Sequence, residues 1–298
     1  MKKVVIIPVF CEAHLVKFQI PNIIDTINPD YIIYNEGMFP RGPESSTIVN
    51  DNFLQKYTLD GHRGFDYDDM KDIVEDAKFK YPNTNIILNE MSYEGLSSAP
   101  ECYFKACSNF SELGIEIEPG DYIFPYEGDV FHHQDSKVEI QGYLNQLTND
   151  TGFTSNWIDF LETQYYCERS TLSPFLDNKE GRHRKVCIRF GTWDFYKDAL
   201  LNFMTQKYPM LSPTDLVTFH YAWWRPGKYK QLRFTQLQRP AIYWEQFETG
   251  LQQIKQNKNN IKTDVLIRPS REIGSIHRNA TYFEIDHPKH IKSHPNWI

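Results

Sequence analysis

Two carboxylates in the middle of the chain have the spacing of a site for a hard divalent cation. Glu127 and Asp129 follow the apolar stretch 121–126 and are separated by a single glycine, Gly128. Paired carboxylates hold hard divalent cations, and such a cation in turn neutralises phosphate groups. Glycine between them allows a backbone or a ligand to approach closely. The competing interpretation is a solvated acidic turn, because Glu-Gly-Asp is a common loop composition.

A histidine far along the chain is the third candidate ligand. His220 lies in the aromatic run T-F-H-Y-A-W-W-R-P-G that starts at Thr218. A neutral imidazole is a common metal ligand, and Arg225 in the same run can pair with a phosphate. The plain alternatives are a hydrogen-bonded core histidine and a surface salt bridge.

A transfer to a hydroxyl group also needs a carboxylate that accepts the proton. Asp194, Asp215 and Glu162 are the candidates. Asp194 lies at an expected helix start, where an aspartate also serves as a partner of the helix dipole. The basic run 179–185 (KEGRHRK) can contact a diphosphate or an anionic acceptor, or form a solvated turn.

Alternating strands and helices are expected to position these residues over the first 135 positions. A continuous apolar run predicts a strand buried on both faces at 4–9, and further strands are predicted at 31–35, 85–89 and 121–126. Helices are predicted from near Pro21, over 67–81 and over 98–113. This alternation predicts an α/β protein with a mostly parallel sheet, in which the strand at 121–126 is central. The second half predicts strands at 153–166 and 185–190, helices at 194–207 and from Pro240, and a tail that packs on the domain.

These segments resemble the GT-A glycosyltransferases, of the family-2-like bacterial or phage type. The strand followed by Glu127-Gly128-Asp129 resembles their D-x-D element, and residues 6–12 (IIPVFCE) resemble their opening strand. Residues 30–37 resemble their second strand, and the pattern H-Y-x-W-x-R-P from His220 is similar to their C-terminal region. The resemblance covers about residues 3–135. It departs from the family at Glu127, where aspartate is usual, and at Cys11, where asparagine is usual.

The resemblance implies a GT-A fold, a Rossmann-like mostly parallel sheet with a C-terminal extension. It implies a glycosyltransferase that moves a sugar from a nucleotide-diphosphate donor to a hydroxyl of a carbohydrate, lipid-linked or protein acceptor. Residues 1–135 would form the nucleotide-sugar-binding half, and residues 136–298 the acceptor-binding half and extension, within one composite domain. The implied Mn²⁺ or Mg²⁺ would be held by Glu127, Asp129 and His220, with Asp194 or Asp215 as the catalytic base. The implied nucleotide contacts are Pro8, Phe10, Glu12, Glu36, Lys105 and Arg225.

Two other functions remain open on the sequence. A nucleotidyltransferase of the same fold would need a loop after the first strand that is rich in glycine and basic residues. The segment after that strand, Cys11-Glu12-Ala13-His14, is neither glycine-rich nor basic. A non-catalytic protein that binds carbohydrate or nucleotide sugar would retain the fold without turnover, and Glu127 in place of aspartate is compatible with it.

Composition narrows the class of protein further. The formal net charge is −7, so there is no global basic field that would favour nucleic acid. No run of about 18 apolar residues occurs, so no transmembrane segment is expected. The five cysteines are odd in number and lack C-x-x-C spacing, which favours reduced thiols and a cytoplasmic protein.

Overall fold

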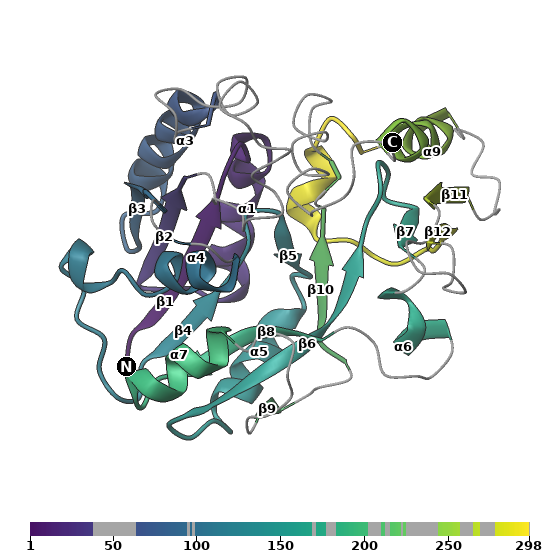
Figure 1. Ribbon diagram of the computed structural model, residues 1–298. Helices are drawn as coiled ribbons and strands as arrows, with labels where there is room; N and C mark the ends of the chain where they lie inside the picture. The colour runs from purple at the N-terminus through teal and green to yellow at the C-terminus, as the bar shows by residue number, and fades with distance from the viewer. Residues whose placement is uncertain are drawn as a thin grey trace.

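The computed structural model describes residues 1–37, 64–93, 96, 99–168, 171–176, 183–201, 210–211, 215–221, 223–224, 244–256, 265–268 and 278–297. Within them the chain forms an α/β protein built on one large, curled, mostly parallel sheet (Figure 1). The predicted fold class is therefore confirmed. In the described part of the chain, no helix has the length and apolar character needed to cross a membrane.

The first half supplies four parallel strands, as the apolar runs predict. They are β1 (Lys3–Val9), β2 (Tyr31–Glu36), β3 (Asn85–Glu90) and β4 (Tyr122–Pro125). Their order is β3-β2-β1-β4, so β1 and β4 lie side by side although β2 and β3 separate them in sequence. The predicted central position of the strand around residue 123 is confirmed, because β4 lies between β1 and β8.

Strands from the second half extend the same sheet beyond β4. The order continues β8-β6-β10-β5, with β8 (His183–Arg189), β6 (Thr151–Asp159), β10 (Val217–His220) and β5 (Val130–His132), and β9 (Met210–Leu211) pairs with β6. Strand β8 is antiparallel to both β4 and β6, whereas β10 is parallel to β6. A separate three-stranded sheet contains β7 (Tyr166–Glu168), β12 (Arg278–Tyr282) and β11 (Val265–Arg268) (Figure 1).

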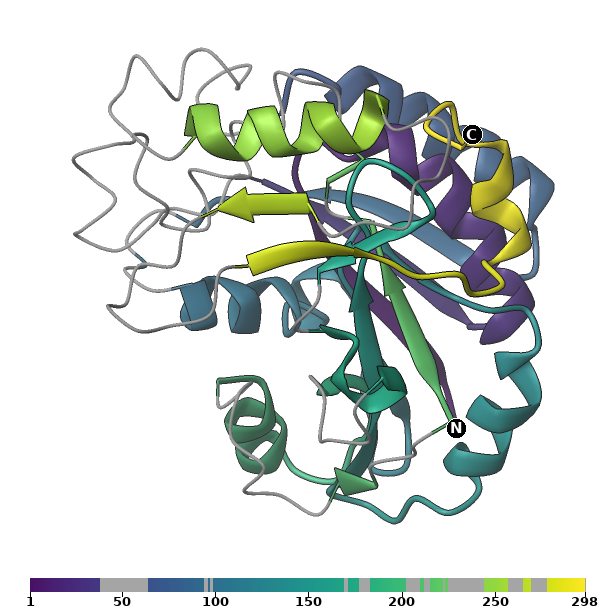
Figure 2. The same cartoon turned by 90° about the vertical axis from the view of Figure 1, so that its right-hand side faces the viewer.

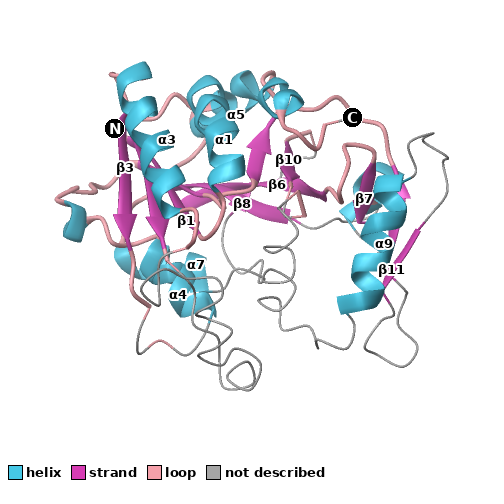
Figure 3. Cartoon of the chain, turned by 90° about the horizontal axis from the view of Figure 1, so that it is seen from above, coloured by secondary structure: helices cyan, strands magenta, loops and turns pink. Residues whose placement is uncertain are grey.

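Helices cover both faces of the large sheet, because alternate residues of its strands are apolar on each side. Val5 and Ile7 of β1 pack with one helix layer, and Val4 and Ile6 pack with the other. The first layer contains α1 (Ala13–Thr26), α3 (Tyr67–Lys80) and α5 (Ser136–Leu144); the second contains α4 (Ala99–Ala106) and α7 (Trp193–Leu201) (Figure 3). The remaining helices are η1 (Ser111–Leu113), α6 (Ser173–Leu176), α9 (Trp244–Gln256) and η4 (Lys289–Ser293).

Two helix predictions from the sequence need correction. The first helix begins at Ala13 and not near Pro21, which lies inside it. The apolar stripe of Leu15, Val16, Ile20 and Ile23 is buried, so tertiary packing outweighs the proline. The helix predicted over 98–113 is shorter: α4 ends at Ala106 and the single turn η1 follows.

The C-terminal segment packs along α1, as the tail was expected to pack on the domain (Figure 2). Lys289 Nζ lies 2.7 Å from Asp25 Oδ2, and His290 Nε2 lies 2.8 Å from the same oxygen. The ring of His294 meets the ring of Phe18 edge-on at 5.4 Å. The segment is thereby fixed to α1 by both ion pairs and ring contacts.

Candidate metal and ligand site

Polar side chains gather along the side of the large sheet at which four of its strands end, which we call the ligand edge. Strands β1, β4, β6 and β10 end there, because they run in the same direction. Strands β8 and β5 run the other way and begin at that edge. The order of strands along the chain reverses between β1 and β4, which is where open α/β sheets bind their ligands.

The three sequence candidates for metal ligands meet at this edge. Glu127 and Asp129 lie on the turn between β4 and β5, and His220 is the last residue of β10. His220 Nε2 is 3.1 Å from Asp129 Oδ1 and 3.7 Å from Glu127 Oε2. One ligand atom of each residue lies within 4.8 Å of the others. Asp129 is 1% exposed and His220 6% exposed, so two of the three candidate ligands are buried, while Glu127 lines an adjoining recess.

The imidazole of His220 is oriented by a fourth residue that the sequence did not single out. Asp159 ends β6 and is the register partner of His220 on the neighbouring parallel strand. Its Oδ1 accepts a hydrogen bond from His220 Nδ1 and a second one, at 2.5 Å, from Trp157 Nε1. Because Nδ1 is thus the protonated nitrogen, Nε2 is the ring nitrogen that faces Asp129 and Glu127.

The charges around His220 favour a cation at this point. Burial disfavours the imidazolium, but the attraction of Asp129 and Asp159 outweighs it and raises the pKa of His220 to about 9. The carboxylates therefore stabilise a positive charge between them, either as a proton on Nε2 or as a metal ion.

The donor set fits a divalent cation. Two ligands at about 2.1 Å from one ion and about 90° apart are about 3 Å from each other, a separation close to the 3.1 Å between His220 and Asp129. Two carboxylates and one imidazole suit Mn²⁺, Mg²⁺ or Zn²⁺. A carboxylate that accepts from the second ring nitrogen, as Asp159 does, is the usual companion of a metal-bound histidine.

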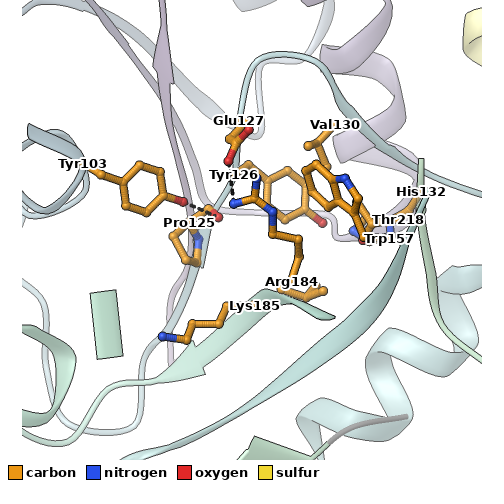
Figure 4. A pocket seen from close by; sticks show the side chains of 11 residues that line it. Tyr103, Pro125, Tyr126, Glu127, Val130, His132, Trp157, Arg184, Lys185 and Thr218 are labelled. Atoms are coloured by element: carbon orange, nitrogen blue, oxygen red, sulfur yellow. Dashed lines mark hydrogen bonds and ion pairs between the residues drawn. The ribbon is translucent and has the colours of Figure 1, made fainter. Parts of the chain in front are cut away.

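A cation of the chain itself also borders the cluster. Arg184, near the start of β8, places Nη1 at 2.9 Å from Glu127 Oε1 and its Cζ at 4.2 Å from the centre of the Trp157 ring. Figure 4 shows these side chains around the recess, together with Tyr103 and Thr218. Trp157 also packs against the ring of His220, with 4.2 Å between centroids.

Gly128 packs closely against the side chains of Val9 and Glu12. A Cβ atom built there would overlap Glu12 Oε2 and would lie 2.8 Å from Val9 Cγ1. Those two residues stand at the end of β1 and just after it, so a side chain at position 128 would push the turn that holds Glu127 and Asp129 away from β1.

Neither predicted catalytic aspartate lies at this edge. Asp194 is exposed in the first turn of α7. This helix follows the far end of β8, where Arg189 lies near Gly120 and Met1. Asp215 is exposed before β10, at the opposite end of that strand from His220, and accepts a 2.5 Å hydrogen bond from the Tyr143 hydroxyl. Strand direction explains both positions, since β8 leaves the ligand edge and β10 runs toward it. The sequence interpretation of these two residues as bases is not supported by their placement.

The third candidate base, Glu162, is on the ligand edge. It lies in the loop between β6 and β7, three positions after Asp159, and is 7% exposed. Its backbone is left-handed, with φ at 59°. That conformation is costly for a residue with a long side chain, and such strain gathers at functional sites.

The predicted nucleotide contacts at the ends of β1 and β2 are buried within the described part of the chain. They comprise Pro8, Phe10, Glu12 and Glu36. The Glu36 side chain accepts a hydrogen bond from the Gly64 amide at 3.1 Å. Burial and the charge of Asp66 hold the pKa of Glu36 well above its ordinary value. This environment favours the protonated form of Glu36, whose side chain pairs with the backbone of Gly64.

The other two predicted nucleotide contacts have different outcomes. Lys105 lies in the last turn of α4 and donates to the carbonyl of Ser92 at 2.6 Å. Arg225 lies outside the described residues.

Comparisons with known proteins add little to this geometry. No family model matches the chain, and no curated protein matches it. Among solved structures it is similar to one titled "Crystal structure of S. aureus TarS 1-349", at 10% identity and a TM-score of 0.34, with 88% of this chain and 75% of that chain covered. A likeness at that score carries no weight, so the fold description rests on strand order and register.

Proposed function

We propose that the chain is a metal-dependent glycosyltransferase that uses a nucleotide-diphosphate sugar. The observation that carries this proposal is the meeting of Glu127, Asp129 and His220 at the ligand edge. This edge adjoins the reversal of strand order between β1 and β4. The parallel α/β half, the acidic turn after its central strand and the distant histidine are the features in which the sequence resembles GT-A enzymes.

The residues of the cluster have distinct roles in this proposal. Asp129 and His220 are the principal ligands of Mn²⁺ or Mg²⁺, because both are buried and their ligand atoms are 3.1 Å apart. Glu127 is a third ligand through Oε2, and Asp159 positions His220. A bound cation would neutralise the diphosphate and stabilise it as the leaving group.

The acceptor hydroxyl must lose a proton during transfer, and Glu162 is the proposed base. It is the candidate of the three that lies on the ligand edge, where it is buried and has a left-handed backbone. Glu162→Gln is expected to lower the transfer rate by about 100-fold or more while nucleotide-diphosphate binding stays within about two-fold. A parallel loss of binding would instead make Glu162 a structural residue.

A panel of nucleotide sugars tests the proposal as a whole. Thermal shifts are measured for the wild-type protein and Asp129→Ala, each with and without Mn²⁺, and released nucleoside diphosphate is then quantified for any sugar that stabilises the protein. We expect at least one nucleotide sugar to stabilise the wild type only with Mn²⁺ and to be turned over. Stabilisation without turnover would indicate a binding protein, and no stabilisation by any member would contradict the proposal.

A further inference from the structure

Arg184 lies at the ligand edge, where it pairs with Glu127 and stacks on the ring of Trp157. Its strand, β8, begins at the ligand edge because it is antiparallel to β4 and β6. The guanidinium is held from two sides, by Glu127 Oε1 at 2.9 Å and by the face of Trp157 at 4.2 Å (Figure 4). A cation–π contact combined with an ion pair fixes the plane of the guanidinium, so the group is oriented before any ligand binds.

The contact with Glu127 joins Arg184 to the metal cluster. Glu127 Oε1 faces Arg184, while Oε2 faces His220 Nε2 at 3.7 Å. One carboxylate thus faces a guanidinium with one oxygen and the proposed ion with the other. The length of a glutamate side chain allows this bridging, which gives a physical reason for Glu127 where the D-x-D pattern has aspartate.

A charge count shows what the arginine adds. Glu127, Asp129 and Asp159 contribute three negative charges when ionised, and a divalent cation with a neutral His220 offsets two of them. Arg184 offsets the third, so this set of groups is neutral before an anion binds, and Glu12, whose carboxylate lies beside Gly128, would add a negative charge when ionised. A diphosphate approaching without Arg184 would meet a net negative cluster.

From these contacts we infer that Arg184 and the metal ion together form a subsite for a phosphate group. Arg184 donates N–H groups to a phosphate oxygen of the ligand while Glu127 and Trp157 keep the guanidinium in place. An arginine has five N–H donors in a planar fork, and this geometry matches phosphate. The inference rests on the proposed function for the identity of the ligand, a nucleotide diphosphate, but concerns only its anionic part.

Another cation of β8, Arg189, serves as the matched control, because it does not reach the cluster. Lys185, the residue after Arg184, lines the same recess and is not used as a control, although it donates to the carbonyl of Ala199 and points away from Arg184 in Figure 4. Arg189, at the far end of the strand, also lies over an aromatic ring, with its Cζ 5.7 Å from the centre of Tyr122, but near Met1. Arg189→Gln removes the same charge from the same strand.

The experiment uses Mn²⁺ and inorganic pyrophosphate as probes and the full-length protein. Mn²⁺ affinity is measured by electron paramagnetic resonance, and pyrophosphate affinity by calorimetry with and without Mn²⁺. For Arg184→Gln we expect pyrophosphate affinity in the presence of Mn²⁺ to fall about 10- to 100-fold, the size of a charge-assisted contact, with Mn²⁺ affinity within about three-fold of wild type. Arg184→Lys should recover part of the loss, and Arg189→Gln should bind both probes like the wild type.

The outcomes separate this inference from the proposed function. Wild-type pyrophosphate affinity in Arg184→Gln, or no pyrophosphate binding by the wild type, would overturn the inference and leave the metal site standing. Loss of pyrophosphate binding in Arg184→Gln together with no use of any nucleotide sugar by the wild type would support the anion subsite and contradict the glycosyltransferase. An equal loss in Arg189→Gln would show a general charge effect and would also overturn the inference.

Discussion

His220 and Asp159 are register partners on neighbouring parallel strands, and their side chains share a hydrogen bond that fixes which imidazole nitrogen faces the acidic turn. Asp159→Asn removes the acceptor charge and allows the ring to take the other tautomer. We expect Mn²⁺ affinity to fall about 10- to 100-fold, the usual effect of losing a carboxylate behind a metal-bound histidine. Titration calorimetry measures it, and unfolding by urea checks that the variant is folded.

The indole of Trp157 provides a control for that experiment. Trp157→Phe removes a second hydrogen bond to Asp159 but leaves the carboxylate and His220 in place. Its Mn²⁺ affinity should stay closer to that of the wild type than the affinity of Asp159→Asn. A larger loss in Trp157→Phe would show that ring packing, and not the carboxylate, positions His220.

The close approach of β1 to the acidic turn predicts that Gly128 cannot carry a side chain. Gly128→Ala should displace Glu127 and Asp129, because the added Cβ overlaps Glu12 and Val9, and Mn²⁺ affinity should fall at least 10-fold. Gly142→Ala is the matched control. Nothing lies within 4 Å of a Cβ built at Gly142, which is inside α5, so this change should raise stability by about 0.5–1 kcal/mol and leave Mn²⁺ binding unchanged. Wild-type Mn²⁺ affinity in Gly128→Ala would show that the turn tolerates the displacement.

Glu36 is expected to be a structural residue whose carboxyl is neutral. Burial holds its pKa well above the ordinary value, so the folded state retains a proton at pH values where the unfolded chain has begun to release it. Stability from this group is therefore lost as pH rises above about 4.5. Glu36→Gln should be at least as stable as the wild type at pH 8, whereas Glu36→Ala should lose about 1–3 kcal/mol because the Gly64 amide loses its acceptor. Denaturation by urea at pH 6 and pH 8 measures both, and a Glu36→Ala variant of full stability with weakened nucleotide binding would restore the sequence interpretation.

The buried His287 predicts a loss of stability in acid. Its Nε2 donates to the Gln164 carbonyl at 2.9 Å and its Nδ1 accepts from the Tyr221 hydroxyl at 2.7 Å, so both nitrogens are used by the neutral ring. Burial, which outweighs the Gln164 carbonyl, lowers the pKa of His287 from 6.5 to about 4. Between those two values the unfolded chain binds more protons than the folded protein does. The free energy of unfolding therefore decreases as the pH is lowered through this window, by about 1.4 kcal/mol per pH unit.

His287→Gln isolates this contribution, because glutamine can donate to Gln164 and accept from Tyr221 without titrating. The difference in melting temperature between wild type and His287→Gln should narrow or reverse from pH 7 to pH 4. A constant difference over that range would show that His287 is not the titrating group.

The placement of Asp194 and Asp215 away from the ligand edge is itself testable. Asp194→Asn and Asp215→Asn should leave Mn²⁺ binding and turnover of the nucleotide sugar within about two-fold of wild type, and Asp215→Asn should change only the contact with Tyr143. A 100-fold loss of turnover in either folded variant would return that residue to the reaction.

The sequence predicted the parallel half of the fold well, for a clear reason. Strands covered on both faces need continuous apolar runs, and Val4–Val9 has one, whereas β3 at the end of the strand order is only partly buried. The start of the first helix was misplaced, because a proline signal is local whereas the burial of Leu15 and Val16 depends on tertiary packing. The sequence also predicted that Glu127, Asp129 and His220 meet at one site. That prediction depended on side chains that are suitable metal ligands and on an acidic turn that follows an expected strand.

What the sequence did not reveal depends on register. Asp159 belongs to a stretch that was interpreted as one strand over 153–166. Its role appears only when β6 pairs with β10, because this pairing places Asp159 beside His220. Arg184 was visible as part of a basic run, but its contact with Glu127 requires β8 to be antiparallel to β4. Neither pairing can be read from one sequence, since strands distant in the chain have many possible partners and registers.

The central claim, a divalent cation held by Glu127, Asp129 and His220, is tested most directly by X-ray anomalous diffraction from crystals soaked in Mn²⁺. We expect one anomalous peak at about 2.1–2.3 Å from Asp129 Oδ1 and His220 Nε2, with Glu127 Oε2 as a third ligand, and no such peak in crystals of Asp129→Ala. Saturating Mn²⁺ with no peak among these three residues in the wild-type crystals would contradict the claim.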